Sequence, residues 1–181
     1  TKNIGKKESH LAMIKRLELP REFHPVLQEY CAKKGIIFLS TPFSEFDADF
    51  LETLNVPAYK FSSGDLNNIP FLKHVAKKGK PMIISTGMGD LAETKQAVQA
   101  ALEEGNDQII ILHSTSNYPP TLAGLNLRAI STLWAELVEY SVPIGYSDNG
   151  TEGNSADIVA VALGACVLEK HFTLDKTMSG P

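Results

Sequence analysis

Short β-branched runs alternate with amphipathic segments along almost the whole chain. Six apolar runs begin at Gly35, Pro57, Pro81, Gln108, Val142 and Cys166. Continuous apolar runs of this length are typical of strands that are buried on both faces, as in a parallel sheet. The pattern therefore predicts six parallel strands.

Helical periods fill the intervals between these runs. Apolar residues recur at helical spacing from Phe23 to Cys31, and Gly35 is suited to end that helix. Asp90 is a good N-cap for a helix that closes near Gly105. Similar stripes occupy residues 46–54, 127–137 and 155–165, and a short amphipathic helix is expected within 10–19. Strand and helix alternate, which predicts right-handed βαβ units.

Polar residues follow every predicted strand. They are Ser40-Thr41, Lys60 to Asp65, Ser85-Thr86, His113 to Tyr118, Ser147 to Asn149 and Glu169 to His171. In a barrel all carboxyl ends of the strands converge on one face, whereas an open sheet needs such residues only beside its switch point. The distribution favours an α/β fold of the (β/α)₈ TIM-barrel type, with about six β/α units in this chain.

Composition narrows the classes of partner. Hydrophobic residues make up 43% of the 181 residues, and the formal net charge of −4 comes from mixed charges. Neither nucleic acid nor an anionic membrane is expected as a partner, and no apolar run approaches the ~18 residues of a membrane span. Cys31 and Cys166 are interpreted as small buried hydrophobic residues, which favours a reducing, cytoplasmic location.

Two neighbouring strands carry candidate metal ligands. In a strand, alternate residues share a face, so Ser147 and Asn149 face one side, as do Glu169 and His171. If that side lines a barrel, the four side chains meet at its mouth. His171 fits either a core histidine bonded to a carbonyl or a metal ligand. Mn²⁺ or Mg²⁺ would accept imidazole, carboxylate and amide oxygen ligands.

Three further strand ends are suited to bind an anion or a hydroxylated substrate. Lys60 in a barrel mouth requires a counter-anion, and the backbone around Ser63 offers donors for phosphate or carboxylate, although "SSGD" alone fits an ordinary turn. Ser85 precedes a helix N-terminus, a position suited to phosphate, but the Gly-Lys-Ser/Thr ending of a P-loop is absent. The strand that begins at Gln108 is followed by Ser116, Asn117 and Tyr118, which could bind a hydroxylated substrate. They also fit an ordinary loop that Pro119 and Pro120 would stiffen.

The motifs as a set resemble a known family. They are "FLSTPF", "YKFSSGDLNNIPFLKHVAKKGKPMIISTGM", "LHSTSNYPP", "IGYSD" and "ALGACVLEKHFTLDKTMSGP". From about Leu17 to Pro181 the sequence is similar to the N-acetylneuraminate (sialic acid) synthase family, which includes legionaminic acid and spore-coat polysaccharide relatives.

The resemblance implies a fold and a reaction. The family has a (β/α)₈ barrel followed by a small antifreeze-like domain. Phosphoenolpyruvate adds to the aldehyde of N-acetylmannosamine or a related acylamino sugar, phosphate leaves, and a nine-carbon 2-keto acid forms. Mn²⁺ or Mg²⁺ polarises the aldehyde oxygen.

The resemblance also implies roles for particular residues. Phosphoenolpyruvate would be bound by Lys60, Ser63, Ser85 and Ser147, with Thr41 and Ser116 beside them. Asp65 corresponds to an acidic residue that faces the sugar, and Tyr118 would contact the amino sugar, with Asn117 next to it. Lys60, Asp65 and Tyr118 are the expected catalytic residues. His171 would be a metal ligand, and Asn149 stands where the family has a second histidine ligand.

Other expectations concern the extent of the chain and the alternatives. Residues 1–181 are expected to be part of the synthase barrel, without its first two strands and without the antifreeze-like domain. Such a fragment would be inactive alone. The full-length protein is expected to form a homodimer, and its substrates are expected to be small molecules. The alternatives are another phosphoenolpyruvate-condensing barrel and a non-catalytic sugar-binding relative, and Asn149 is the reason to keep the latter.

Overall fold

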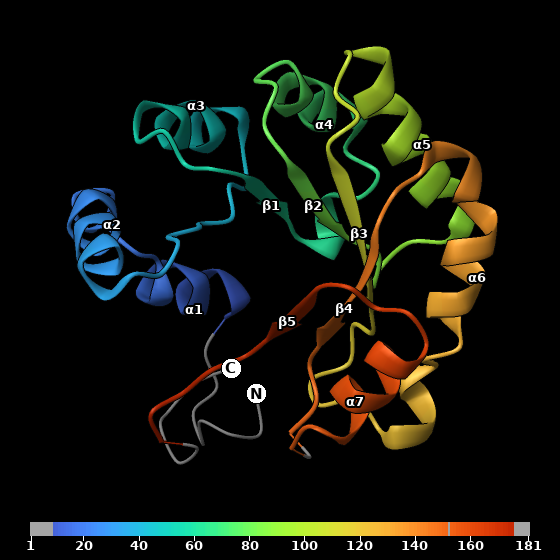
Figure 1. Ribbon diagram of the computed structural model, residues 1–181. Coiled ribbons are helices and arrows are strands. Elements are labelled where there is room, and N and C mark those ends of the chain that lie inside the picture. Colours follow the sequence, from blue (N-terminus) through green and yellow to red (C-terminus); the bar gives the residue numbers. More distant parts are fainter. Residues whose placement is uncertain (1–8, 152, 176–181) are drawn as a thin grey trace. The chain divides into compact units, whose positions relative to one another are not determined.

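The computed structural model describes residues 9–151 and 153–175. The chain divides into two units, residues 39–171 and residues 1–38 with 172–181. All five strands of the described residues lie in the unit of residues 39–171: β1 Tyr59–Phe61, β2 Met82–Ser85, β3 Ile109–Ser114, β4 Ile144–Asp148 and β5 Leu168–Lys170. They pair in parallel in the order of the sequence (Figure 1).

This strand order distinguishes a barrel from an open doubly wound sheet. Every crossover leads to the adjacent strand in the same direction, so the sheet has no switch point at which the winding reverses. The predicted barrel-type α/β fold is confirmed as a curled half-barrel of parallel strands.

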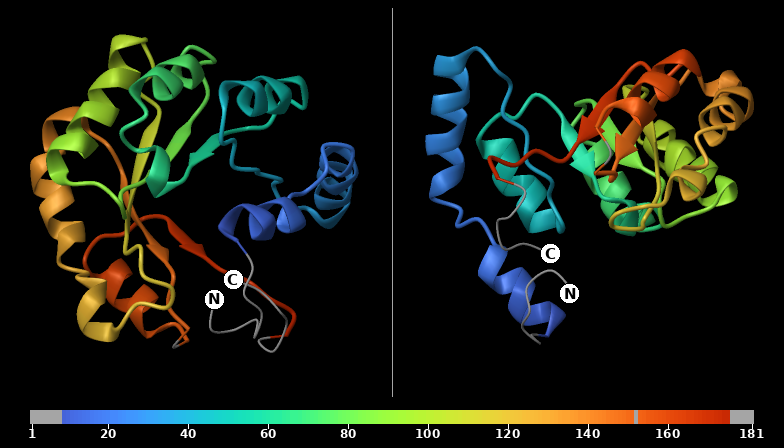
Figure 2. Two further views of the ribbon diagram at one scale, coloured as in Figure 1. Left: turned by 180° about the vertical axis from the view of Figure 1, so that it is seen from behind. Right: turned by 90° about the horizontal axis from the view of Figure 1, so that it is seen from below.

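Helices cover the outer side of the sheet (Figures 1 and 2). The helices of this unit are α3 Glu45–Thr53, α4 Ile69–Ala76, α5 Leu91–Glu103, α6 Ala129–Glu136 and α7 Ser155–Ala162. Short 3₁₀ turns occupy η1 Ser63–Asp65, η2 Leu122–Leu125 and η3 Val138–Tyr140. The predicted cap of α5 is confirmed, because Asp90 and Glu93 form a reciprocal capping box. Across the described residues no helix is both long and apolar enough to cross a membrane.

The core lies between the sheet and these helices. Eight apolar, outward-facing residues of β1 to β4 are at most 1% exposed: Tyr59, Phe61, Met82, Ile84, Ile109, Ile111, Ile144 and Tyr146. Burying each large apolar side chain contributes about 1.5–3 kcal/mol before entropy is counted. Because alternate strand residues face opposite sides, the remaining positions face the inner side of the half-barrel, where chemistry is possible.

The other unit contains two helices among its described residues, α1 His10–Leu17 and α2 Phe23–Lys34. The hydroxyl of Ser9 caps α1 by accepting a hydrogen bond from the amide of Ala12 at 3.1 Å. Gly35 ends α2 in the left-handed region, as the sequence predicts.

Two expectations are wrong, and one helix was not predicted. The run from Gly35 forms no strand, because it has no ladder partner in the sheet, and Ile36 and Ile37 are exposed. Cys31 is half-buried and Cys166 is exposed, so neither is the fully buried residue that was expected. Helix α4 was missed altogether.

The start of α4 was nonetheless readable. Asn68 caps the helix by accepting a hydrogen bond from the amide of Phe71 at 3.4 Å, and a proline stands in the first turn. Asparagine before proline-containing first turns is a helix-start signal.

Candidate active site

The inner face of the half-barrel carries polar residues at the carboxyl ends of its strands. Ser114, Ser147 and Glu169 are aligned across β3, β4 and β5 by register. Lys60 on β1 and Ser85 on β2 also occupy inner positions, because they alternate with the buried core residues of their strands. Five strands thus each direct a polar side chain toward the same space.

Lys60 is the central cation of this face. Its ammonium donates hydrogen bonds to Ser85 Oγ at 2.9 Å and to the carbonyl of Phe61 at 2.7 Å, and it pairs with Glu169 at 3.2 Å. The side chain is only 13% exposed. Burial lowers the pKa of Lys60, and the nearby Glu169 carboxylate opposes this effect without cancelling it.

The Lys60–Glu169 ion pair also shows that the sheet is strongly curled. These residues lie on β1 and β5, the first and last strands of the sheet. In a flat sheet four strand spacings of about 4.8 Å would separate the two strands by about 19 Å. Contact at 3.2 Å therefore requires the sheet to wrap around the inner space. Period-two alternation had placed Glu169 on this face, but its pairing with Lys60 was not predicted.

Asn149 and His171 form a second polar pair at this mouth. The Asn149 amide nitrogen donates to the carbonyl of Thr115 at 2.8 Å and to Ser114 Oγ at 3.4 Å. Its carbonyl oxygen Oδ1 is therefore directed to His171 Nε2, which lies 3.1 Å away. Because Oδ1 can only accept, Nε2 carries the proton of this hydrogen bond.

The donor atoms of this pair suit a hard divalent cation. An amide oxygen and an imidazole nitrogen are both accepted by Mn²⁺ and Mg²⁺, and a cation held by both would replace the proton between them. Within residues 9–151 and 153–175 no group of three or more His, Cys, Asp or Glu side chains converges as metal ligands would. Asn149 and His171 thus fit as part of a ligand set.

A loop cluster borders the two polar pairs. Tyr118 is 69% exposed, and its ring lies edge-on to the His171 ring at 5.7 Å between centroids. Ser63 Oγ and Ser116 Oγ are 3.5 Å apart, which joins η1 to the exit of β3. The absence of a side chain at Gly87 leaves room for Ser116, because a Cβ at Gly87 would lie 2.7 Å from Ser116 Oγ.

Some predicted residues are not joined to these pairs. Asp65 accepts a hydrogen bond from Ser62 Oγ at 2.6 Å within η1, and Thr41 lies half-buried before α3. Asn117 is exposed in the loop after β3. His113, which the sequence grouped with a strand end, faces outward instead: its Nε2 lies 2.8 Å from the carbonyl of Leu125, and burial lowers the pKa of its imidazole.

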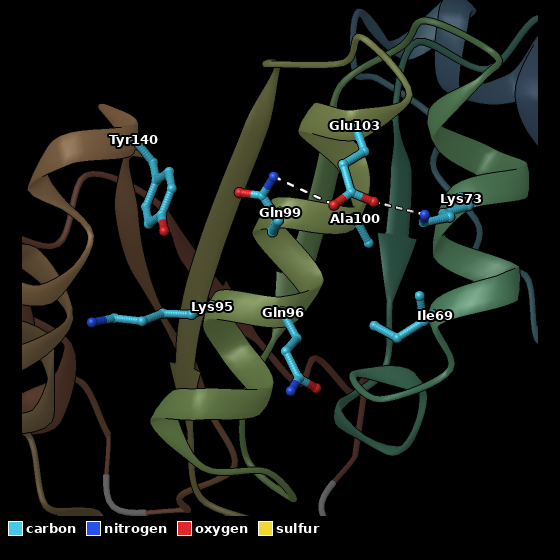
Figure 3. A pocket seen from close by; sticks show the side chains of 8 residues that line it. All are labelled: Ile69, Lys73, Lys95, Gln96, Gln99, Ala100, Glu103 and Tyr140. Carbon is cyan, nitrogen blue, oxygen red and sulfur yellow. Dashed lines mark hydrogen bonds and ion pairs between the residues drawn. The ribbon is translucent and has the colours of Figure 1, made fainter.

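A groove of about 430 Å³ lies away from this mouth, on the outer helices (Figure 3). It runs over α4, α5 and η3. Its lysines are already neutralised, because Lys73 pairs with Glu103 at 2.7 Å and Lys95 pairs with Glu136 at 2.7 Å. We therefore place the candidate site at the inner strand ends and not in the groove.

Comparisons with known proteins show the family of this chain. A family model described as the NeuB family matches residues 1–181. The chain belongs to the NeuB family. One relative is the N,N'-diacetyllegionaminic acid synthase of Legionella pneumophila subsp. pneumophila. It is 44% identical to this NeuB-family chain, over 99% of this chain and 50% of its own length. An uncharacterized protein of Methanocaldococcus jannaschii is 48% identical over 98% of this chain and 52% of its own length.

A solved structure is similar over the whole fold. The crystal structure of N-acetylneuraminic acid (sialic acid) synthetase from Leptospira borgpetersenii serovar Hardjo-bovis, in complex with citrate, matches with a TM-score of 0.87 and 34% identity. The match covers 97% of this chain and 60% of that one. The chain thus spans about half the length of the curated relatives that it matches.

Proposed function

We propose that this NeuB-family chain forms part of an enzyme that condenses phosphoenolpyruvate with an acylamino sugar and releases phosphate. The observation that carries the proposal is the convergence of two chemically different pairs on one inner face. Lys60 and Ser85 are suited to an anion, and Asn149 and His171 are suited to a cation. The names of the relatives, which include synthases of legionaminic, sialic and pseudaminic acids, support the same reaction class.

In the proposed reaction the methylene carbon of phosphoenolpyruvate forms a carbon–carbon bond with the aldehyde carbon of the sugar. The aldehyde oxygen takes up a proton, and water adds to the carbon that bears the phosphate. Departure of phosphate then leaves a 2-keto acid, so that one phosphoenolpyruvate, one sugar and one water give one keto acid and one phosphate.

Lys60 holds the anionic substrate in this scheme. Its ammonium is already desolvated and already bonded to Ser85, so an incoming phosphate or carboxylate meets an oriented donor with little reorganisation. Ser147 on β4 supplies a further hydroxyl donor around the same space, and so do Ser63 and Ser116. Glu169 balances the charge of Lys60 until the substrate replaces it.

Asn149 and His171 hold the divalent cation, Mn²⁺ or Mg²⁺. When bound, the cation would supply Lewis-acid polarisation of the aldehyde oxygen. The backbone carbonyl of Thr115 keeps the Asn149 amide turned so that its oxygen faces this position. Tyr118, with Asn117 beside it, lies at the exposed rim next to His171, where the sugar would enter. Thr41 and Asp65 complete the proposed set as contacts to phosphoenolpyruvate and sugar.

The experiment is a phosphate-release assay on the intact protein, with phosphoenolpyruvate and each of several acylamino sugars, with and without Mn²⁺. The proposal expects phosphate only when sugar, phosphoenolpyruvate and metal are all present. Sugar binding without any phosphate release would favour the non-catalytic sugar-binding alternative instead. Release with a sugar phosphate that lacks an acylamino group would favour a different phosphoenolpyruvate-condensing barrel. A homodimer and a cytoplasmic location stay predictions.

A further inference from the structure

The outer side of the sheet carries a charged cluster directly behind the Asn149–His171 pair. Asp148 and Lys170 are register partners, the last such pair between β4 and β5. Lys170 bonds to Asp148 Oδ2, to Asp157 Oδ2 at 2.8 Å and to the carbonyl of Gly153 at 2.8 Å. We call Asp148, Lys170 and Asp157 the outer clamp.

The carboxylate of Asp148 is bonded on both oxygens. Besides Lys170 on Oδ2, its Oδ1 accepts the hydroxyl of Tyr146 at 3.1 Å and the amide of Gly150 at 2.8 Å. The residue is only 2% exposed. One carboxylate therefore ties together β4, the turn that follows it and β5, and Lys170 extends the connection to α7.

The position of the clamp matters because the ladder between β4 and β5 is short, with three register partners. Strand β5 has three residues, all of them exposed, and among the described residues it pairs with β4 alone. Asn149 and His171 are the first residues beyond the last ladder pair. Strand ends with few buried contacts open most readily. The backbone ladder therefore ends immediately before Asn149 and His171, whose side chains face each other.

We propose that the outer clamp positions Asn149 and His171 against each other, so that their donor atoms are aligned before a cation binds. The cation part of this inference rests on the proposed function. Asp148 and Lys170 precede the two ligands by one residue, so they point to the opposite face and act through the backbone. They are positioning residues and touch neither substrate nor metal.

The alignment can be measured without metal. Nitrogen-15 NMR of the intact protein, at about pH 8.5 where an ordinary imidazole is neutral, reports which ring nitrogen of His171 carries the proton. The clamp predicts the Nε2–H form, fixed by Asn149 Oδ1. In Lys170→Met the ring should report a mixture of tautomers, and Lys170→Arg should restore the fixed form.

The consequence for the cation is measured by electron paramagnetic resonance, which counts free Mn²⁺ as it is titrated against the intact protein. Loss of residues that orient metal ligands typically weakens binding by about 10- to 100-fold, and Lys170→Met should fall in this range. Lys78→Met is the matched control. Lys78, like Lys170, pairs with two carboxylates, Glu52 at 2.6 Å and Asp49, but it lies away from the mouth. It should leave both measurements unchanged.

The outcomes separate the inference from the proposed function. A folded Lys170→Met protein with the wild-type tautomer and Mn²⁺ affinity would overturn the clamp. If Lys170→Met does not fold, Gly150→Ala is used in its place, because a Cβ at residue 150 would lie 2.8 Å from Asp148 Oδ1 and disturb the clamp. The tautomer of His171 and the Mn²⁺ affinity then decide in the same way. Should wild type bind no Mn²⁺ while the tautomer responds as expected, the positioning stands and the metal role fails. A mixed tautomer in the wild-type protein overturns the positioning.

Discussion

Replacing Lys60 by methionine tests the proposed anion-binding half of the site. Methionine keeps most of the side-chain volume but removes the ammonium, which makes hydrogen bonds of 2.9 Å and 2.7 Å and an ion pair of 3.2 Å. A hydrogen bond to a charged group contributes about 1.5–3 kcal/mol. At about 1.4 kcal/mol per factor of ten, this corresponds to roughly a 10- to 150-fold weaker affinity for phosphoenolpyruvate.

The cost to folding should be much smaller than this loss of affinity. Glu169, the partner left behind, is 45% exposed and can be hydrated, and burial already disfavours the charged form of Lys60 in the folded protein, so removing the ammonium costs little stability. The two effects can therefore be measured apart, by chemical denaturation for folding and by titration calorimetry for phosphoenolpyruvate.

Calorimetry of the intact protein with phosphoenolpyruvate alone is the direct assay, supported by the KM of the full reaction. Lys80→Met serves as the control, because Lys80 also donates two hydrogen bonds of 2.7 Å, to Asn55 and Val56, but at the start of β2. The control should bind phosphoenolpyruvate normally. A folded Lys60→Met protein with unchanged Kd and KM would refute the role assigned to Lys60.

Three more substitutions test separate parts of the account. Asn149→His should tighten Mn²⁺ binding by on the order of tenfold, about 1.4 kcal/mol, and an unchanged Mn²⁺ titration would remove Asn149 from the ligand set. Gly87→Ala should lower the free energy of unfolding by about 1–3 kcal/mol, because the new Cβ would lie 2.7 Å from Ser116 Oγ and 3.2 Å from the backbone carbonyl oxygen of Ser114, which cannot rotate away; a wild-type denaturation midpoint would contradict this. His113 has a lowered pKa in the folded protein, so below the unfolded value of about 6.5 the unfolded state binds more protons and stability falls as pH falls. Its replacement by glutamine should flatten that part of the pH–stability curve, and an unaltered slope would count against the buried neutral imidazole.

The sequence predicts the inner face well because strand alternation is a local rule. Ser147 and Glu169 are register partners, and Asn149 contacts His171, as period-two counting requires. His113 was grouped with the strand end by residue range and not by alternation. Counting by two from Ile109 and Ile111 places it on the outer face, where its imidazole lies against the carbonyl of Leu125.

Other features depend on tertiary context. The run from Gly35 has the composition of a strand, yet a strand exists only through ladder hydrogen bonds to a neighbour, and the sheet supplies none to it. The Lys60–Glu169 contact depends on how far four strand pairings curl, which no local pattern encodes. Asp148 bonds both the turn after β4 and Lys170 on β5, and the second of these contacts depends on the pairing of the two strands.

The central claim is that a carbon–carbon bond is made at this mouth, and labelled phosphoenolpyruvate tests it most directly. The intact protein is incubated with Mn²⁺, N-acetylmannosamine or a diacetamido sugar, and phosphoenolpyruvate that carries carbon-13 at its methylene carbon. The account predicts that the label moves into the methylene carbon of a 3-deoxy 2-keto acid, in step with phosphate release. Label that appears only in the methyl group of pyruvate, with every sugar tried, would contradict it.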